Sequence, residues 1–105
     1  MDWHVIKYLY PKSYDRFIET MFPYVGVISL TTLEYYDLKK LYGFFDREGI
    51  FLTVEMYIPN RWVHTVSLYN GIVFSSNQEP KSSREEIECD GFSECFKILD
   101  KFLRY

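Results

Sequence analysis

The chain has 105 residues, a length that fits a single domain with a small core. It carries 12 basic and 15 acidic residues, and because no segment is basic we do not expect nucleic acid as a partner. No apolar run is long enough to span a bilayer, and nothing resembles a secretory signal. We therefore expect a cytoplasmic protein that does not bind a membrane.

The N-terminal part predicts a strand followed by a helix. Residues 3 to 10 alternate loosely and end at Pro11, which favours a strand. Residues 25 to 30 form a short apolar run, which favours a second strand or a buried connector. Between them Ser13 resembles an N-cap, and apolar residues repeat at helical spacing up to Pro23: Tyr14, Phe17, Ile18, Met21 and Phe22.

A second helix is expected over residues 32 to 47. Thr31 and Glu34 have the spacing of a capping box, in which each side chain satisfies a free backbone amide at the helix start. Gly49 is placed to end the helix in a left-handed conformation. The apolar stripe of this helix consists of Tyr35, Leu38, Leu41, Tyr42 and Phe45.

An antiparallel meander is predicted after this helix. Alternation of apolar residues indicates the strands, and Pro59-Asn60 forms the first turn. Asn70-Gly71 is the stronger hairpin signal, because such a turn favours residues that accept positive φ at both positions. The three predicted strands cover residues 50–58, 62–69 and 72–74.

The last segment is expected to be a polar loop, residues 75–83, followed by a helix over residues 84–104. Ser83 and Glu86 repeat the capping-box pattern. Asp90-Gly91 leaves two alternatives open: the pair breaks the helix in two, or Gly91 lets the helix approach the sheet closely. Cys95 follows Cys89 by six positions, so the two lie about 240° apart on a helix and do not pair. We interpret both as core residues in a reducing compartment.

Motifs for catalysis, metal binding or nucleotide binding are absent from the sequence. We therefore expect no catalytic residue, no metal ligand and no cofactor, and we do not expect an enzyme. His64 is the one candidate for acid–base chemistry, and the pattern around it favours a packed histidine. The acidic cluster at the start of the last helix fits the helix dipole better than a cation site: Glu85, Glu86, Glu88 and Asp90.

The hairpin region is nearly free of charge, since only Glu55 and Arg61 are ionised between residues 50 and 76. A solvated sheet face should be mostly polar, so this region requires cover on both faces. Either the N-terminal strand and helix fold over the outward face, or a partner does. The candidate interaction residues are Phe51, Tyr57, Trp62, Val63 and Tyr69.

Three patterns follow one another from Leu38 onward. A helix ends in Phe44-Phe45-Asp46-Arg47-Glu48-Gly49 and leads into an apolar strand; a strand with Trp62 near its start follows, and then a closing helix from Ser83 to Leu99. This order resembles a loose group of small, uncharacterised accessory proteins encoded by tailed bacteriophages of gut bacteria, over about two-thirds of the chain. The resemblance implies an α+β fold and, for a phage protein, the host cell cytoplasm. It implies no activity.

We therefore expect one α+β domain over residues 1–105, a three- to four-stranded antiparallel meander with helices packed on one face. The leading functional hypothesis is a non-enzymatic phage accessory or interaction protein. It would bind a host or phage protein, or form a homodimer, through the aromatic sheet face. A second hypothesis is a protein that binds or sequesters a nucleotide-like small molecule between tyrosine and tryptophan side chains. A third is a small hydrolase that uses His64.

Overall fold

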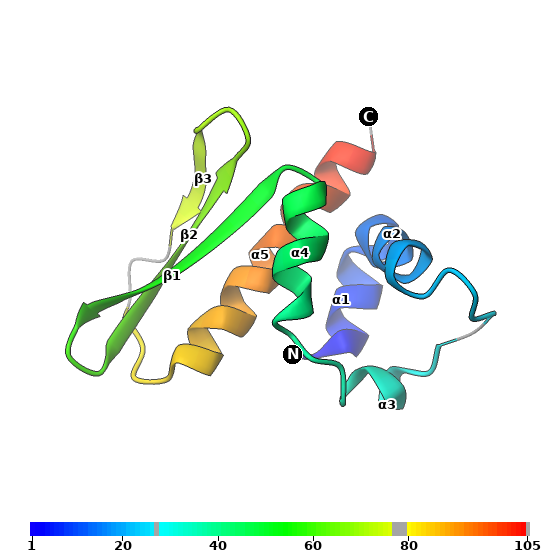
Figure 1. The fold of residues 1–105 in the computed structure, drawn as a ribbon, viewed down its shortest axis with the longest axis horizontal. Coiled ribbons are helices and arrows are strands. Elements are labelled where there is room, and N and C mark those ends of the chain that lie inside the picture. The colour runs from blue at the N-terminus through cyan, green and yellow to red at the C-terminus, as the bar shows by residue number, and fades with distance from the viewer. Residues whose placement is uncertain (27, 77–79, 105) are drawn as a thin grey trace.

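The computed structural model describes residues 1–26, 28–76 and 80–104. Figure 1 shows an antiparallel sheet on one side, α5 and α4 in the middle, and α1 and α2 on the far side of α5. The predicted α+β class is confirmed. The elements are α1 (Trp3–Leu9), α2 (Pro11–Met21), α3 (Leu30–Leu33), α4 (Lys40–Arg47), β1 (Ile50–Ile58), β2 (Arg61–Leu68), β3 (Val73–Ser76) and α5 (Arg84–Leu103).

The strand expected over residues 3 to 10 is wrong, because this segment forms α1. Asp2 caps the helix: its carboxylate accepts hydrogen bonds from the backbone N–H of His4 at 3.1 Å and of Val5 at 3.3 Å. Trp3 and Ile6, three residues apart, are the buried side chains of α1. A fourth strand is therefore not available to the sheet from this end of the chain.

The predicted helix before Pro23 is confirmed as α2, and its apolar side chains face the core. Its start differs from the prediction. Pro11 occupies the first helical position, where a missing N–H costs nothing, and Ser13 is buried inside the first turn. The strand or buried connector expected over residues 25 to 30 is wrong for the described part, because Val25 is exposed and α3 begins at Leu30. Val27 lies outside the described residues.

The single helix expected over residues 32 to 47 is wrong, because it is divided into α3 and α4. The side chain of Ser29, not the Thr31–Glu34 pair, caps α3 by accepting from the backbone N–H of Thr32 at 3.1 Å. Asp37 interrupts the helix, since its carboxylate accepts the backbone N–H of Lys39 at 3.0 Å and so favours a turn.

The sheet has the strand order β1-β2-β3. β1 and β2 form a long hairpin whose turn is Pro59-Asn60, with Asn60 at φ 63°. In the second turn only Gly71 has a positive φ, contrary to the prediction for both positions; the side chain of Asn70 instead accepts the backbone N–H of Ile72 at 3.1 Å. The short β3 pairs with the other edge of β2. Part of the loop predicted over residues 75–83, residues 77–79, lies outside the described residues.

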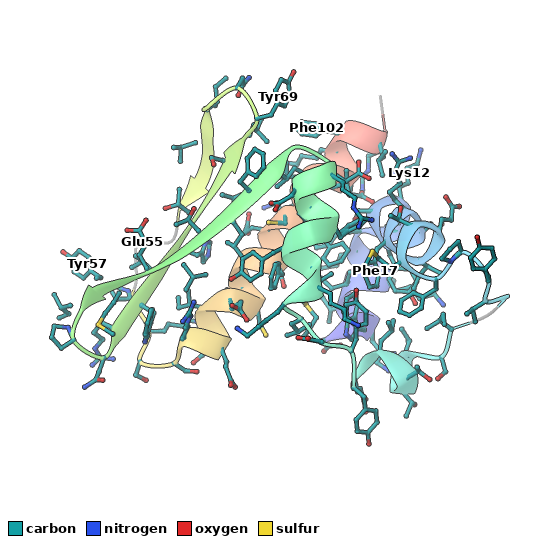
Figure 2. The ribbon with its side chains drawn as sticks, in the orientation of Figure 1. Lys12, Phe17, Glu55, Tyr57, Tyr69 and Phe102 are labelled. Carbon is teal, nitrogen blue, oxygen red and sulfur yellow. The ribbon has the colours of Figure 1, made fainter. Side chains whose placement is uncertain are left out.

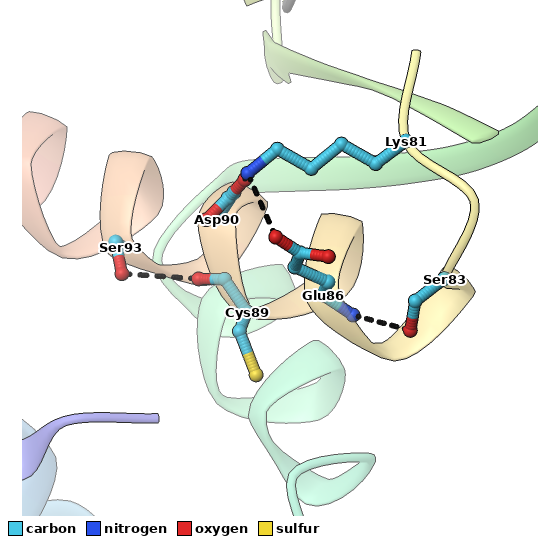
Figure 3. Close-up of polar contacts among 6 residues, drawn as sticks. All are labelled: Lys81, Ser83, Glu86, Cys89, Asp90 and Ser93. Atoms are coloured by element: carbon cyan, nitrogen blue, oxygen red, sulfur yellow. Dashed lines mark hydrogen bonds and ion pairs between the residues drawn. The ribbon is translucent and has the colours of Figure 1, made fainter. Parts of the chain in front are cut away.

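The closing helix is continuous, so of the two alternatives for Asp90-Gly91 the close approach to the sheet is confirmed. A Cβ at Gly91 would collide with the side chain of Leu52 on β1. Ser83 caps α5 as predicted, by accepting the backbone N–H of Glu86 at 3.3 Å, whereas the Glu86 carboxylate pairs with Lys81 at 3.2 Å (Figure 3). Lys81 also binds Asp90 at 2.7 Å and so ties the loop to the second turn of α5.

Aromatic rings fill the core between α5 and the N-terminal helices. Trp3 stacks on Phe17 with ring centroids 5.1 Å apart, and Phe96 meets both rings edge-on. Cys95 is buried in the core, whereas Cys89 is only half-buried and is not the core residue that we expected; both thiols are free, as predicted. Burial raises the pKa of Cys95, so its thiol stays protonated.

Candidate interaction face

The face of the sheet that points away from α5, here called the outer face, consists of alternate residues of two strands. Across the hairpin Phe51 pairs with Ser67, and Glu55 pairs with Val63. Figure 2 shows Glu55 and Tyr57 pointing to the side of β1 opposite α5. The outer face is made of Phe51, Thr53, Glu55, Tyr57, Val63, Thr65 and Ser67.

None of the described residues covers the outer face. Phe51 is 37% exposed and Tyr57 is 67% exposed. The N-terminal segment cannot provide the cover that the sequence suggested, because α1 and α2 pack on the far side of α5 (Figure 1). That alternative is wrong, and within the described part of the single chain the outer face lacks the cover that we expected from its few charges. Of the five candidate interaction residues, three belong to the outer face: Phe51, Tyr57 and Val63.

Tyr69, a fourth candidate residue, lies past the end of β2 and is 80% exposed. Its backbone N–H donates to the carbonyl of Gly49 at 3.0 Å, which continues the ladder by one pair. Ile72 and Val73 are exposed at the same turn. Tyr69 therefore belongs to the end of the sheet opposite Tyr57, as Figure 2 shows.

Trp62 is separated from the other candidate residues because its side chain faces α5. The Arg84 guanidinium lies 5.2 Å from the Trp62 ring centroid, in cation–π geometry. Trp62 and Lys81 also exchange two backbone hydrogen bonds, of 2.7 and 3.0 Å. Its half-buried ring thus helps to hold the loop before α5. Trp62 does not share a surface with Tyr57. One ligand could therefore not stack between these two side chains.

Sequence alternation missed the exposed tip of the β1–β2 hairpin. Met56 and Ile58 were expected on the covered side of the sheet, but both are exposed, as is Tyr57 between them. The ladder shifts by one residue between Met56 and Ile58, and the tip extends beyond the helices (Figure 1). Alternation indicates which face a side chain takes, but not how far along the strand the covering helix reaches.

His64 lies on the covered face of β2 and is 4% exposed. Burial lowers the pKa of His64, and nearby Asp90, Glu94 and Lys81 modify that effect. A substrate would have to displace α5 to reach this imidazole. The geometry therefore matches a packed histidine better than an acid–base catalyst.

The acidic cluster of α5 is divided among separate partners. Glu86 and Asp90 bind Lys81, whereas buried Glu88 accepts a hydrogen bond from the Tyr42 hydroxyl at 2.7 Å. Burial, together with this hydrogen bond, raises the pKa of Tyr42. A surface hollow of about 330 Å³ beside Glu88 is lined by Met1, by residues of the turn before α4 and by residues of the first two turns of α5. Within the described residues no group of histidine, cysteine or carboxylate side chains is arranged to hold a metal ion.

Comparison of the chain with protein-family models, with curated proteins and with solved structures finds no match. Among the described helices, none is long and apolar enough to cross a bilayer.

Proposed function

We propose that the protein is a non-enzymatic interaction protein that binds another protein, in the simplest case a second copy of itself, through the outer face and the adjoining hairpin tip. The observation that carries the proposal is the exposure of Phe51 and Tyr57 on a face with one charge, Glu55. Aromatic residues combined with few charges are typical of the centre of a protein interface.

The fold supplies a rigid platform for this face. Leu52 and Val66, on the covered side of the same strands, are buried against α5, and Gly91 brings the helix close to β1. A preformed surface loses little conformational entropy on binding, which favours affinity. A two-fold axis is the simplest arrangement, because one patch then serves both copies.

The test compares exposed tyrosines on and off the outer face. We expect Tyr57→Asp to be folded and monomeric by light scattering, because the charge would be buried at the interface. Tyr35→Asp is the matched control, since Tyr35 is at least as exposed but lies in the turn after α3. It should keep the mass of the unmodified chain. An equal mass for the unmodified chain and Tyr57→Asp would overturn the proposal.

A further inference from the structure

The outer edge of β1 carries backbone donors and acceptors with no backbone partner among the described residues. The hydrogen bond from Tyr69 N–H to the Gly49 carbonyl sets the phase of the ladder, so odd-numbered residues of β1 bond to β2. The N–H and C=O groups of Leu52, Val54 and Met56 therefore point away from the sheet. Such a row is a template for pairing with another extended chain, which is the basis of strand addition.

The sequence of β1 is close to a palindrome centred on Val54. Apolar residues occupy both ends, then an aromatic residue, an apolar residue and a polar residue follow inward from each side. Read from the two ends, the pairs are Ile50 with Ile58, Phe51 with Tyr57, Leu52 with Met56, and Thr53 with Glu55. An antiparallel strand pair related by a two-fold axis sets each residue opposite its palindromic counterpart.

We propose that two copies of this chain join edge to edge through antiparallel pairing of β1 with β1 about a two-fold axis at Val54. This inference rests on the proposed function and names its partner, a second copy. The two three-stranded sheets would then form one continuous sheet, with Val54 opposite Val54, and Leu52 opposite Met56 of the second copy. All three residues present their backbone groups at the edge, so the register agrees with the phase of the ladder.

The same register explains the exposed apolar residues at the hairpin tip. On the outer face it places Phe51 beside Tyr57 of the second copy, an aromatic pair that occurs twice. On the covered face exposed Met56 meets Leu52 of the second copy, which is buried against α5. The two outer faces become neighbours in one larger surface.

Charge placement favours this register over its neighbour. With the axis at Val54, Glu55 lies opposite Thr53 of the second copy and no like charges are paired. Moving the axis to Glu55 would set two carboxylates directly opposite each other, which destabilises strand pairs. It would also bring Pro59, which lacks an N–H, into the paired segment.

The first experiment uses Thr53, whose side chain is exposed on the outer face. Thr53→Glu places a second carboxylate opposite Glu55 at both symmetric sites, and we expect it to raise the dimer dissociation constant about tenfold. Thr53→Lys should lower the constant several-fold. Thr65→Glu is the control: Thr65 pairs with Thr53 within the hairpin but lies one strand away from the edge, so the constant should not change. Sedimentation equilibrium measures all four proteins.

The second experiment removes one edge donor. Val54→Pro deletes an N–H that β2 does not use, so the hairpin ladder stays intact and dimerisation should be lost. Val54→Ala gives up the packing of the valine side chain but keeps the N–H, and it should stay dimeric. Circular dichroism tests whether both variants are folded. If Val54→Pro is unfolded, the Thr53 series alone decides whether β1 pairs with β1.

The inference and the proposed function fail separately. If Tyr57→Asp reduces the mass while Thr53→Glu and Thr65→Glu weaken association equally, the copies associate by their outer faces and only the edge pairing is overturned. If Thr53→Glu and Thr53→Lys both leave the dissociation constant unchanged, the edge pairing is also overturned. If the unmodified chain is monomeric at every concentration, both the edge pairing and the self-association in the proposed function are overturned.

Discussion

Asp100 of α5 holds the start of α2, and its removal is expected to be the most costly single change outside the aromatic core. The carboxylate is 1% exposed, and its Oδ1 accepts the backbone N–H groups of Lys12 at 2.9 Å and Ser13 at 3.1 Å. Because Pro11 has no N–H, these are the first free donors of the helix. Oδ2 forms an ion pair with Arg104 at 2.7 Å. One side chain thus caps helix donors that lie 87 and 88 residues earlier in the chain.

The expected loss follows from these contacts. Losing an N-cap costs about 1 kcal/mol, and leaving a buried donor unsatisfied costs about 1–3 kcal/mol more. Asp100→Ala should therefore lower the free energy of unfolding by about 2–4 kcal/mol, from a total of about 5–15 kcal/mol for a domain of this size. Asp100→Asn keeps the acceptor and loses the ion pair with half-exposed Arg104, so about 1 kcal/mol is expected.

Urea unfolding followed by far-ultraviolet circular dichroism measures these differences. Asp15→Ala is the control, since Asp15 is an exposed carboxylate on α2 that caps nothing. It should stay within about 0.5 kcal/mol of the unmodified chain. If Asp100→Ala behaves like Asp15→Ala, or if Asp100→Asn costs as much as Asp100→Ala, the capping argument is refuted.

Two further predictions concern the contact between α5 and the sheet. Gly91→Ala should destabilise the fold by about 1–2 kcal/mol, because the added methyl group collides with Leu52. In a Leu52→Ala background the same substitution should stabilise the fold by up to about 1 kcal/mol through helix propensity. Equal effects in both backgrounds would contradict the close approach. Burial lowers the pKa of His64 below 6.5, so the unfolded chain takes up the proton first. The melting temperature should fall as the pH is lowered below 6.5, and this fall should be smaller in His64→Gln. An equal fall in His64→Gln and the unmodified chain would refute the prediction.

Periodicity predicted the elements whose side chains repeat a pattern over several turns or pairs. The apolar residues of α2 recur over three turns, and the alternation in β1 continues for nine residues, so both were recognised. α1 has only Trp3 and Ile6 to reveal its period, and this spacing was read as loose alternation. Short elements carry too few repeats for the period to decide between helix and strand.

Hydrogen bonds and packing contacts that periodicity does not indicate account for the other differences. Asp37 ends a helical pattern by a local hydrogen bond that competes with the apolar stripe around it. The cap of α2 comes from Asp100, which no local signal around Ser13 indicates. For the candidate site, alternation predicted which residues share the outer face, but the absence of a lid depends on where α1 and α2 pack.

The layered core also determines what kind of dimer this chain would form. α5 is covered by the sheet on one side and by α1 and α2 on the other, so the main hydrophobic core is complete within one chain. Pairing through β1 would add cover mainly to Met56, Tyr57 and Ile58, which are exposed at the tip. The folded monomer would then be stable by itself. Association would add stability by mass action, as expected for a reversible dimer, and would not be a condition for folding.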